Sequence, residues 1–144
     1  MEIHVFHGPN LNLLGQRDSA HYGNLTLNQL DSELMNLAGD LGIELEARQT
    51  NSESTLVTWI QESKADGILL NAGGYTHTSV AIRDAISAHD APVLEIHLSN
   101  IHARESFRRE SLIAPVCEGQ IAGLGPDSYR MGLRSLHRSL SGLA

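Results

Sequence analysis

The run Ile68-Leu69-Leu70 is apolar without interruption, and the polar, glycine-rich stretch 71–79, Asn-Ala-Gly-Gly-Tyr-Thr-His-Thr-Ser, follows it directly. A strand that is covered on both faces shows such a run, and strands of this kind are typical of parallel sheets. Apolar residues then recur at helical spacing over residues 80–86. The segment therefore predicts a buried strand, a polar turn at its carboxyl end and a covering helix.

The same alternation of short apolar runs and helical patterns continues on both sides of this segment. Thr26 opens a helix, with Gln29 three residues later as in a capping box. Further strands are predicted at residues 3–6, 43–49 and 92–98 and near 120–123, and further helices around 59–60 and from about 128. The pattern predicts one α/β domain over residues 1–144. Its expected form is a flavodoxin-like, doubly wound, five-stranded parallel sheet of order 2-1-3-4-5 in three α/β/α layers.

The composition limits the partners that this chain can have. Its 144 residues are 41% hydrophobic and 19% charged, which is typical of a globular domain. The formal net charge of −7 argues against nucleic acid, which needs a basic face. No apolar run is long enough to span a membrane, and the opening residues show no signal-peptide pattern. A single cysteine, Cys117, suits a reducing compartment. We therefore expect a cytoplasmic protein without nucleic-acid or membrane partners.

The first predicted strand and its helix are separated by residues 7–25, far more than the two to six residues (roughly) typical of such connections. A long connection of this kind is usually functional and is often a lid. The alternative is a disordered insertion, but Leu11, Leu13 and Leu14 are residues expected to pack against the domain. This segment is thus a candidate part of a ligand site.

Two more polar stretches follow predicted strands, and ligands of open parallel sheets bind beyond those strand ends. In the stretch 71–79, Gly73 and Gly74 allow the backbone to approach a ligand closely, and free N–H groups near Thr78 and Ser79 favour an anion. The alternative is a simple turn. A cluster of three arginines further along, within residues 104–109, can focus a positive field on a small anion, or can be a solvated helix face.

The strand at residues 92–98 carries the clearest chemical signal. Alternation places Glu95, His97 and Ser99 on one face, and Leu94, Ile96 and Leu98 on the other. A carboxylate two residues from a histidine can orient an acid–base imidazole, and two unpaired ionisable groups would be costly in a central strand. The alternative is a structural histidine beside a surface glutamate. A metal site from Glu95, His97 and His102 matches no zinc pattern, so no metal is expected.

Three motifs now stand together. They are Gly8-Pro9-Asn10-Leu11-Asn12-Leu13-Leu14-Gly15 with Arg17 and Tyr22-Gly23, then Asn71-Ala72-Gly73-Gly74 with Thr76-His77-Thr78-Ser79, and finally Glu95-Ile96-His97-Leu98-Ser99-Asn100-Ile101-His102-Ala103-Arg104 with Phe107-Arg108. In this order and spacing the chain resembles the type II 3-dehydroquinate dehydratases over nearly its whole length. The resemblance implies an anti elimination of water from 3-dehydroquinate to 3-dehydroshikimate through an enolate, in the shikimate pathway or in quinate catabolism.

The resemblance also implies catalytic roles. Tyr22 would remove the C2 proton as a tyrosinate, and Arg17 and Arg104 would favour its ionised form. Such help is needed because an unperturbed tyrosine titrates near about pH 10. His97, oriented by Glu95, would protonate the departing C1 hydroxyl.

Further roles follow from the same resemblance. Asn10 would hold a water that stabilises the enolate oxygen, and the remaining substrate contacts would come from Asn71, His77, Arg108 and the backbone N–H groups of Leu98 and Ser99. Asp84 would reach the substrate of a neighbouring subunit. The resemblance implies no cofactor, no metal and a homododecamer built as a tetramer of trimers.

Two departures from the family pattern are visible. His7 stands where the family usually has asparagine, and Asp18-Ser19 stands where it favours Glu-Pro. Two other functions are compatible with parts of the sequence. A non-enzymatic flavodoxin-like module that binds a small anion would need only the glycine turn and the arginines, but has no use for Tyr22 and the Glu95–His97 pair. A structural oligomerisation domain leaves the long polar segment unexplained.

Overall fold

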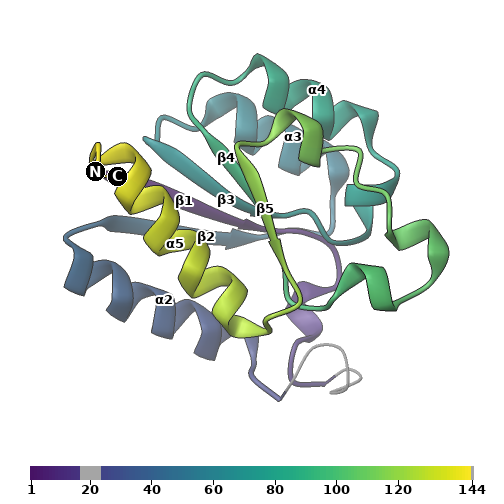
Figure 1. Ribbon diagram of the computed structural model, residues 1–144, viewed down its shortest axis with the longest axis horizontal. Helices are drawn as coiled ribbons and strands as arrows, with labels where there is room; N and C mark the ends of the chain where they lie inside the picture. The colour runs from purple at the N-terminus through teal and green to yellow at the C-terminus, as the bar shows by residue number, and fades with distance from the viewer. Residues whose placement is uncertain (17–23, 144) are drawn as a thin grey trace.

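The computed structural model describes residues 1–16 and 24–143, and a parallel five-stranded sheet forms its centre (Figure 1). The strands are β1 (Glu2–His7), β2 (Glu44–Gln49), β3 (Gly67–Asn71), β4 (Val93–His97) and β5 (Gly119–Ala122). Their order in the sheet is β2-β1-β3-β4-β5, and each neighbouring pair is parallel. The predicted fold class and strand order are confirmed.

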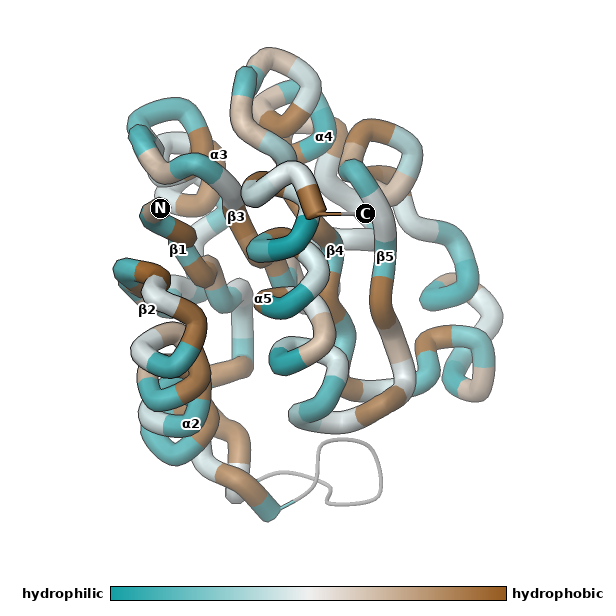
Figure 2. Tube along the Cα trace, turned by 60° about the vertical axis from the view of Figure 1, so that its left-hand side comes forward, coloured by the Kyte–Doolittle hydropathy of each residue, from teal (hydrophilic) through white to brown (hydrophobic). Residues whose placement is uncertain are grey.

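Two layers of helices cover the sheet. The helices α2 (Leu27–Leu41) and α5 (Pro126–Leu140) lie on one face, and α3 (Glu53–Glu62) and α4 (Val80–Ala88) lie on the other (Figure 1). A separate apolar core fills each interface: Leu34 and Leu133 belong to the first, and Leu56 and Ile82 to the second. Figure 2 shows hydrophobic colour along the central strands, whereas α2 alternates between hydrophilic and hydrophobic segments.

Local signals in the sequence set the helix ends. α2 begins with the predicted capping box, because the Thr26 hydroxyl accepts the N–H of Gln29 and the Gln29 side chain accepts the N–H of Thr26. It ends at Gly42, which adopts the left-handed conformation with φ 71°. α5 begins at Pro126, before the predicted start at Ser128. The Ser128 hydroxyl instead accepts the N–H of Leu124.

The strand order reverses between β1 and β3, so their carboxyl ends border a crevice. His7 of β1 pairs with Asn71 of β3, and the Gly8 N–H donates to the Asn71 carbonyl oxygen over 2.7 Å. Short 3-10 helices follow the strands: η1 (Leu11–Leu13), η2 (Gly73–His77), η3 (Ile101–Ala103), η4 (Ser106–Arg108) and η5 (Ala114–Val116). Among residues 1–16 and 24–143, no helix is both long enough and apolar enough to cross a membrane.

Candidate active site

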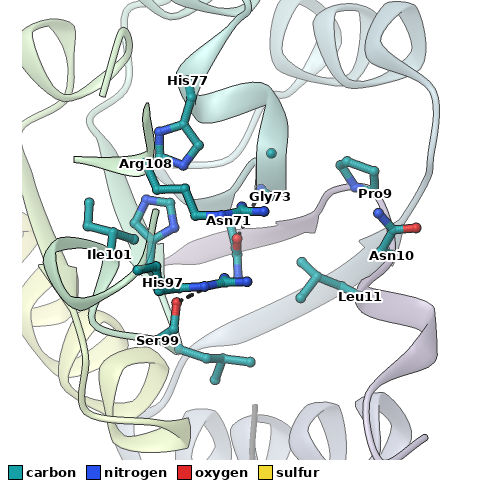
Figure 3. A pocket seen from close by; sticks show the side chains of 13 residues that line it. Pro9, Asn10, Leu11, Asn71, Gly73, His77, His97, Ser99, Ile101 and Arg108 are labelled. Carbon is teal, nitrogen blue, oxygen red and sulfur yellow. Dashed lines mark hydrogen bonds between the residues drawn. The ribbon is translucent and has the colours of Figure 1, made fainter. Parts of the chain in front are cut away.

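A pocket of about 120 Å³ opens at the carboxyl ends of β1, β3 and β4 (Figure 3). Eight predicted site residues line it: Asn10, Asn71, His77, His97, Leu98, Ser99, Arg104 and Arg108. Pro9, Leu11, Gly73, Gly74 and Ile101 complete the lining. In Figure 3, Pro9, Asn10 and Leu11 lie on one side, opposite His77, His97 and Arg108. The fold thus brings together side chains that three separate motifs supply.

Backbone packing holds the ends of β1 and β3 close together at this pocket. A Cβ added to Gly8 would lie 2.7 Å from both the carbonyl carbon and the carbonyl oxygen of Ala72. Gly73 has φ +58°, and a Cβ there would lie 3.0 Å from the Pro9 carbonyl oxygen. Both positions therefore need glycine, the second because of its left-handed backbone as well. The sequence predicted close approach of a ligand at Gly73, and the close approach that the structure shows there is to the Pro9 backbone.

Leu11 and Leu14 anchor the segment after β1, since both are buried in the core beside α2 and α5. Leu13 is 39% exposed, so the prediction that it packs against the domain is wrong. Asn10 precedes η1 with φ 69°, a left-handed conformation that asparagine tolerates better than most residues. Its backbone N–H donates to Oδ1 of Asn51 over 3.0 Å. The described part of this segment is therefore firmly attached where it enters the pocket.

The Glu95–His97 pair has the predicted geometry. Oε2 of Glu95 lies 2.5 Å from Nε2 of His97, and both side chains are almost fully buried. Glu95 also accepts hydrogen bonds from the Ser111 hydroxyl, over 2.8 Å, and from the Gln120 amide, over 2.6 Å. The opposite face of β4 packs Leu94, Ile96 and Leu98 into the core, as the alternation predicted.

The electrostatics of Glu95 result from two opposing effects. Burial alone would raise the pKa of this carboxyl. The hydrogen bond and charge of His97, with the hydrogen bonds from Gln120 and Ser111, outweigh burial and place the pKa below its ordinary value. Glu95 is therefore an anion that accepts the Nε2–H of His97, which leaves Nδ1 of His97 for a ligand. This arrangement suits a proton donor or acceptor.

Cationic and polar groups surround this pair. A guanidinium N–H of Arg104 donates to the Ser99 hydroxyl over 3.4 Å, and Arg108 forms an ion pair with Glu105 at 3.1 Å. The His77 ring lies roughly parallel to the His97 ring, with centroids 6.4 Å apart, and its Nδ1–H donates to the Glu110 carbonyl oxygen. Two guanidinium groups beside two imidazoles favour an anionic ligand. Arg109, the third arginine of the cluster, does not line the pocket.

Some predicted site residues lie elsewhere. Arg17 and Tyr22 fall outside the described residues. Asp84 is exposed on α4 and does not line the pocket of its own chain. The expectation of free N–H groups near Thr78 and Ser79 is wrong, because both donate to the Tyr75 carbonyl oxygen, over 3.2 and 2.9 Å. The segment forms the 3-10 helix η2 before α4 begins, and a carbonyl oxygen of η2 accepts the N–H groups of Thr78 and Ser79.

Sequence reasoning missed a buried group behind the pocket. The His7 ring lies between the Asp31 carboxylate, 2.8 Å from Nε2, and the Tyr129 hydroxyl, 2.9 Å from Nδ1. The same hydroxyl lies 2.9 Å from Nδ2 of Asn71, a pocket residue. These four residues come from β1, α2, α5 and β3, so no local motif joins them. The one available signal was an ionisable residue, His7, at the end of a buried strand.

Within residues 1–16 and 24–143, one group of side chains has ligand atoms close enough together to hold a metal ion, and it consists of Glu2, His4 and Glu46. It lies toward the amino ends of β1 and β2, away from the pocket, and none of its members lines the pocket. His4 already has partners, with Nδ1 2.8 Å from the Ser63 hydroxyl and Nε2 3.0 Å from Glu2.

Fold and pocket together define a doubly wound α/β protein whose site joins an acid–base pair to two guanidinium groups at the switch in strand order. The family model described as dehydroquinase class II matches residues 1–137. The chain belongs to this family, which confirms the resemblance seen in the sequence.

Individual relatives agree with this assignment. A 3-dehydroquinate dehydratase of Geotalea daltonii is 57% identical over 138 residues, which are 94% of this chain and 96% of the relative. One of a Synechocystis species is 53% identical over 145 residues, covering 99% and 95%. The crystal structure of type II dehydroquinase from Butyrivibrio crossotus superimposes with a TM-score of 0.93 and 41% identity, covering 94% of this chain and 97% of that one.

Proposed function

We propose that this protein dehydrates 3-dehydroquinate to 3-dehydroshikimate by anti elimination through an enolate. Family membership supports the reaction, as do the relatives named 3-dehydroquinate dehydratase. The observation in the structure that carries the proposal is the buried Glu95–His97 pair at the pocket wall. An elimination of water needs a group that protonates the leaving hydroxyl, and this imidazole is held for that purpose.

The reaction has two proton transfers. Tyr22, as a tyrosinate, takes the C2 proton, and the electrons of that C–H bond form the enolate with the C3 carbonyl. The enolate then expels the C1 hydroxyl, which takes a proton from His97 and leaves as water. The new C1=C2 double bond is conjugated with the restored carbonyl. Glu95 keeps the imidazole oriented and stabilises its charged form between turnovers.

Positive charge supports the first step. Arg17 and Arg104 favour the tyrosinate, because a cation within about 4–6 Å lowers the pKa of a tyrosine. Arg17 and Tyr22 lie outside the described residues, so their roles rest on the motif that matches the family. Asn10, at the pocket, holds a water against the enolate oxygen.

The remaining pocket residues bind the substrate. Backbone N–H groups of Leu98 and Ser99 take the substrate carboxylate, and the ring hydroxyls contact Asn71, His77 and Arg108. Polar donors and acceptors at fixed positions suit a small, highly hydroxylated acid. The reaction needs neither metal nor imine, and Lys64 is the only lysine in the chain.

We further propose that residues 1–144 form one catalytic domain, which works in the cytoplasm as a homododecamer, a tetramer of trimers. Asp84 then reaches the substrate bound by a neighbouring subunit. Its exposure on α4, outside the pocket of its own chain, is compatible with this role. The assembly itself rests on the family resemblance.

Addition of 3-dehydroquinate to the purified protein tests the proposal. We expect a rise in ultraviolet absorbance as the conjugated enone forms, and an unchanged rate after thorough chelation. The matched control is His97→Gln, for which the absorbance should rise about 100-fold more slowly than for the wild type. Folded wild-type protein that gives no absorbance rise would favour the alternative, a non-enzymatic module for small anions. That alternative is not favoured, because it gives the Glu95–His97 pair no use.

A further inference from the structure

We propose that Asp31, His7 and Tyr129 form a buried hydrogen-bond chain that fixes the carboxamide of Asn71 in the orientation needed to bind substrate. The inference rests on the proposed function, since it concerns how one substrate-binding side chain is positioned. None of the three residues touches the pocket, so they are positioning residues.

The chain is continuous from the surface to the pocket. Oδ1 of Asp31 lies 2.8 Å from Nε2 of His7, and Nδ1 of His7 lies 2.9 Å from the Tyr129 hydroxyl. That hydroxyl lies 2.9 Å from Nδ2 of Asn71. The side chain of Asp31 is 25% exposed, whereas His7 and Tyr129 are 0% exposed and Asn71 is 3% exposed. Of the three positioning residues, Asp31 is therefore the one that is open to solvent.

The direction of every hydrogen bond follows from one backbone contact. The Gly73 N–H donates to Oδ1 of Asn71 over 3.1 Å, which makes the other atom of the carboxamide, Nδ2, the donor to Tyr129. The Tyr129 hydroxyl accepts that bond and donates its own hydrogen to Nδ1 of His7. His7 is then the neutral tautomer that carries its hydrogen on Nε2, and it donates this hydrogen to Asp31.

The reverse arrangement leaves a buried group unsatisfied. If Nδ1 of His7 carried a hydrogen, the Tyr129 oxygen would accept from both His7 and Asn71, and the hydroxyl hydrogen would have no acceptor among residues 1–16 and 24–143. An unsatisfied buried donor destabilises the fold. Burial raises the pKa of Tyr129 far above its usual range, and the Asp31 charge raises it further, although the Asn71 hydrogen bond acts the other way. The phenol therefore remains a donor.

The chain has a consequence at the pocket. Tyr129 uses one hydrogen of the Asn71 amide and Gly73 uses one lone pair of its oxygen. The second N–H and the second lone pair are the groups that a substrate hydroxyl can use. Without Tyr129, the Gly73 N–H alone orients the carboxamide. The plane of the amide is then less well fixed, so the N–H and the lone pair that face the substrate are less well positioned.

A double-mutant cycle separates positioning from a general structural effect. Tyr129→Phe removes one oxygen atom and keeps the buried ring. In the wild-type background we expect kcat/KM to fall about tenfold, the effect of losing one buried hydrogen bond. In an Asn71→Ala background the same change should cost less than about twofold, because Tyr129 acts through Asn71. Equal losses in both backgrounds would overturn the proposal.

A second pair of variants separates an effect on catalysis from an effect on stability. His4 and His7 are both buried on β1, each between a carboxylate and a hydroxyl, but His4 lies away from the pocket. His7→Gln should lower kcat/KM, whereas His4→Gln should lower only the free energy of unfolding. Similar losses of kcat/KM in both would contradict the proposal. If Tyr129→Phe fails to fold, Asp31→Ala replaces it in the cycle.

A spectroscopic measurement does not depend on activity. The ¹⁵N chemical shifts of the His7 ring should report the neutral Nε2–H tautomer near pH 7, and a hydrogen on Nδ1 would overturn the chain. If the wild-type protein forms no product, the proposed function fails and this measurement still tests the hydrogen bonds. If the wild type is active and the cycle is additive, only the positioning inference fails.

Discussion

Nε2 of His97 lies 2.5 Å from Oε2 of Glu95, and the Glu95 side chain is fully buried whereas His97 is 6% exposed at the pocket wall. The Glu95 carboxylate is satisfied on both oxygens, by His97 and Gln120 on one and by Ser111 on the other. The pair therefore has a single ring orientation and a single nitrogen, Nδ1, for the ligand.

Glu95→Gln should lower turnover by about 10- to 100-fold, because the neutral amide orients the imidazole poorly and does not stabilise its charged form. Steady-state kinetics with 3-dehydroquinate measure the change. Glu118→Gln is the matched control. Glu118 is exposed away from the pocket, and its carboxylate accepts a hydrogen bond from Ser139. The turnover of this variant should stay near that of the wild type. Near-native turnover of Glu95→Gln would contradict the role.

Stability should depend on pH through Glu95. Its pKa in the folded protein lies below the ordinary value of 4.5. A carboxyl group whose pKa is lower in the folded state stabilises the fold at pH values above its unfolded-state pKa. This contribution is lost as the pH falls through the folded-state pKa. In urea unfolding, the difference in free energy between wild type and Glu95→Gln should be constant near pH 7 and shrink below pH 4.5. A difference that does not change down to about pH 3 would refute the expectation.

Tyr22→Phe should cut turnover by orders of magnitude with a modest change in substrate binding, because phenylalanine cannot accept the C2 proton. Arg17→Ala should also reduce turnover severely, since the tyrosinate loses a cation. The control is Tyr75→Phe, which removes a hydroxyl that donates to the Asn51 carbonyl oxygen outside the pocket. Kinetics that leave Tyr22→Phe close to wild type would defeat the mechanism.

Asp84 should act across a subunit boundary. Co-assembly of inactive Tyr22→Phe subunits with inactive Asp84→Ala subunits should restore part of the activity, because some sites then combine both native residues. Hybrids of Tyr22→Phe with His97→Gln serve as control and should stay inactive, since those two residues belong to the same site of one chain. Hybrids with Asp84→Ala that stay inactive, although each parent is folded, would show that Asp84 does not act in trans.

Much of this architecture could be predicted from sequence because the signals are local. The run Ile68-Leu69-Leu70 and the capping box at Thr26 specify a strand and a helix without help from distant residues. The alternation of side chains along β4, which is also a local property of the sequence, predicted that Glu95 and His97 share one face. Polar residues after parallel strands then meet at one edge of the sheet, so eight predicted residues line the pocket.

The missed features depend on contacts between distant segments. The Glu95 carboxylate accepts hydrogen bonds from Ser111, which precedes η5, and from Gln120 of β5, and both residues lie far from Glu95 in the sequence. His7 and Tyr129 are brought together from the two ends of the chain. At Thr78 and Ser79 the prediction was wrong, because a 3-10 turn satisfies donors that an α-helix start would leave open. Such outcomes are set by tertiary packing and by turn type, which residue spacing does not encode.

The close backbone contact between Gly8 and Ala72 limits how this pocket can be redesigned. Any side chain at Gly8 would push apart the ends of β1 and β3, and with them Asn10 and Asn71 on the two sides of the crevice. A directed-evolution library aimed at new substrates should therefore keep codon 8 unvaried. Diversity belongs at Gly74, which lines the pocket and where an added Cβ would meet no atom within 4 Å.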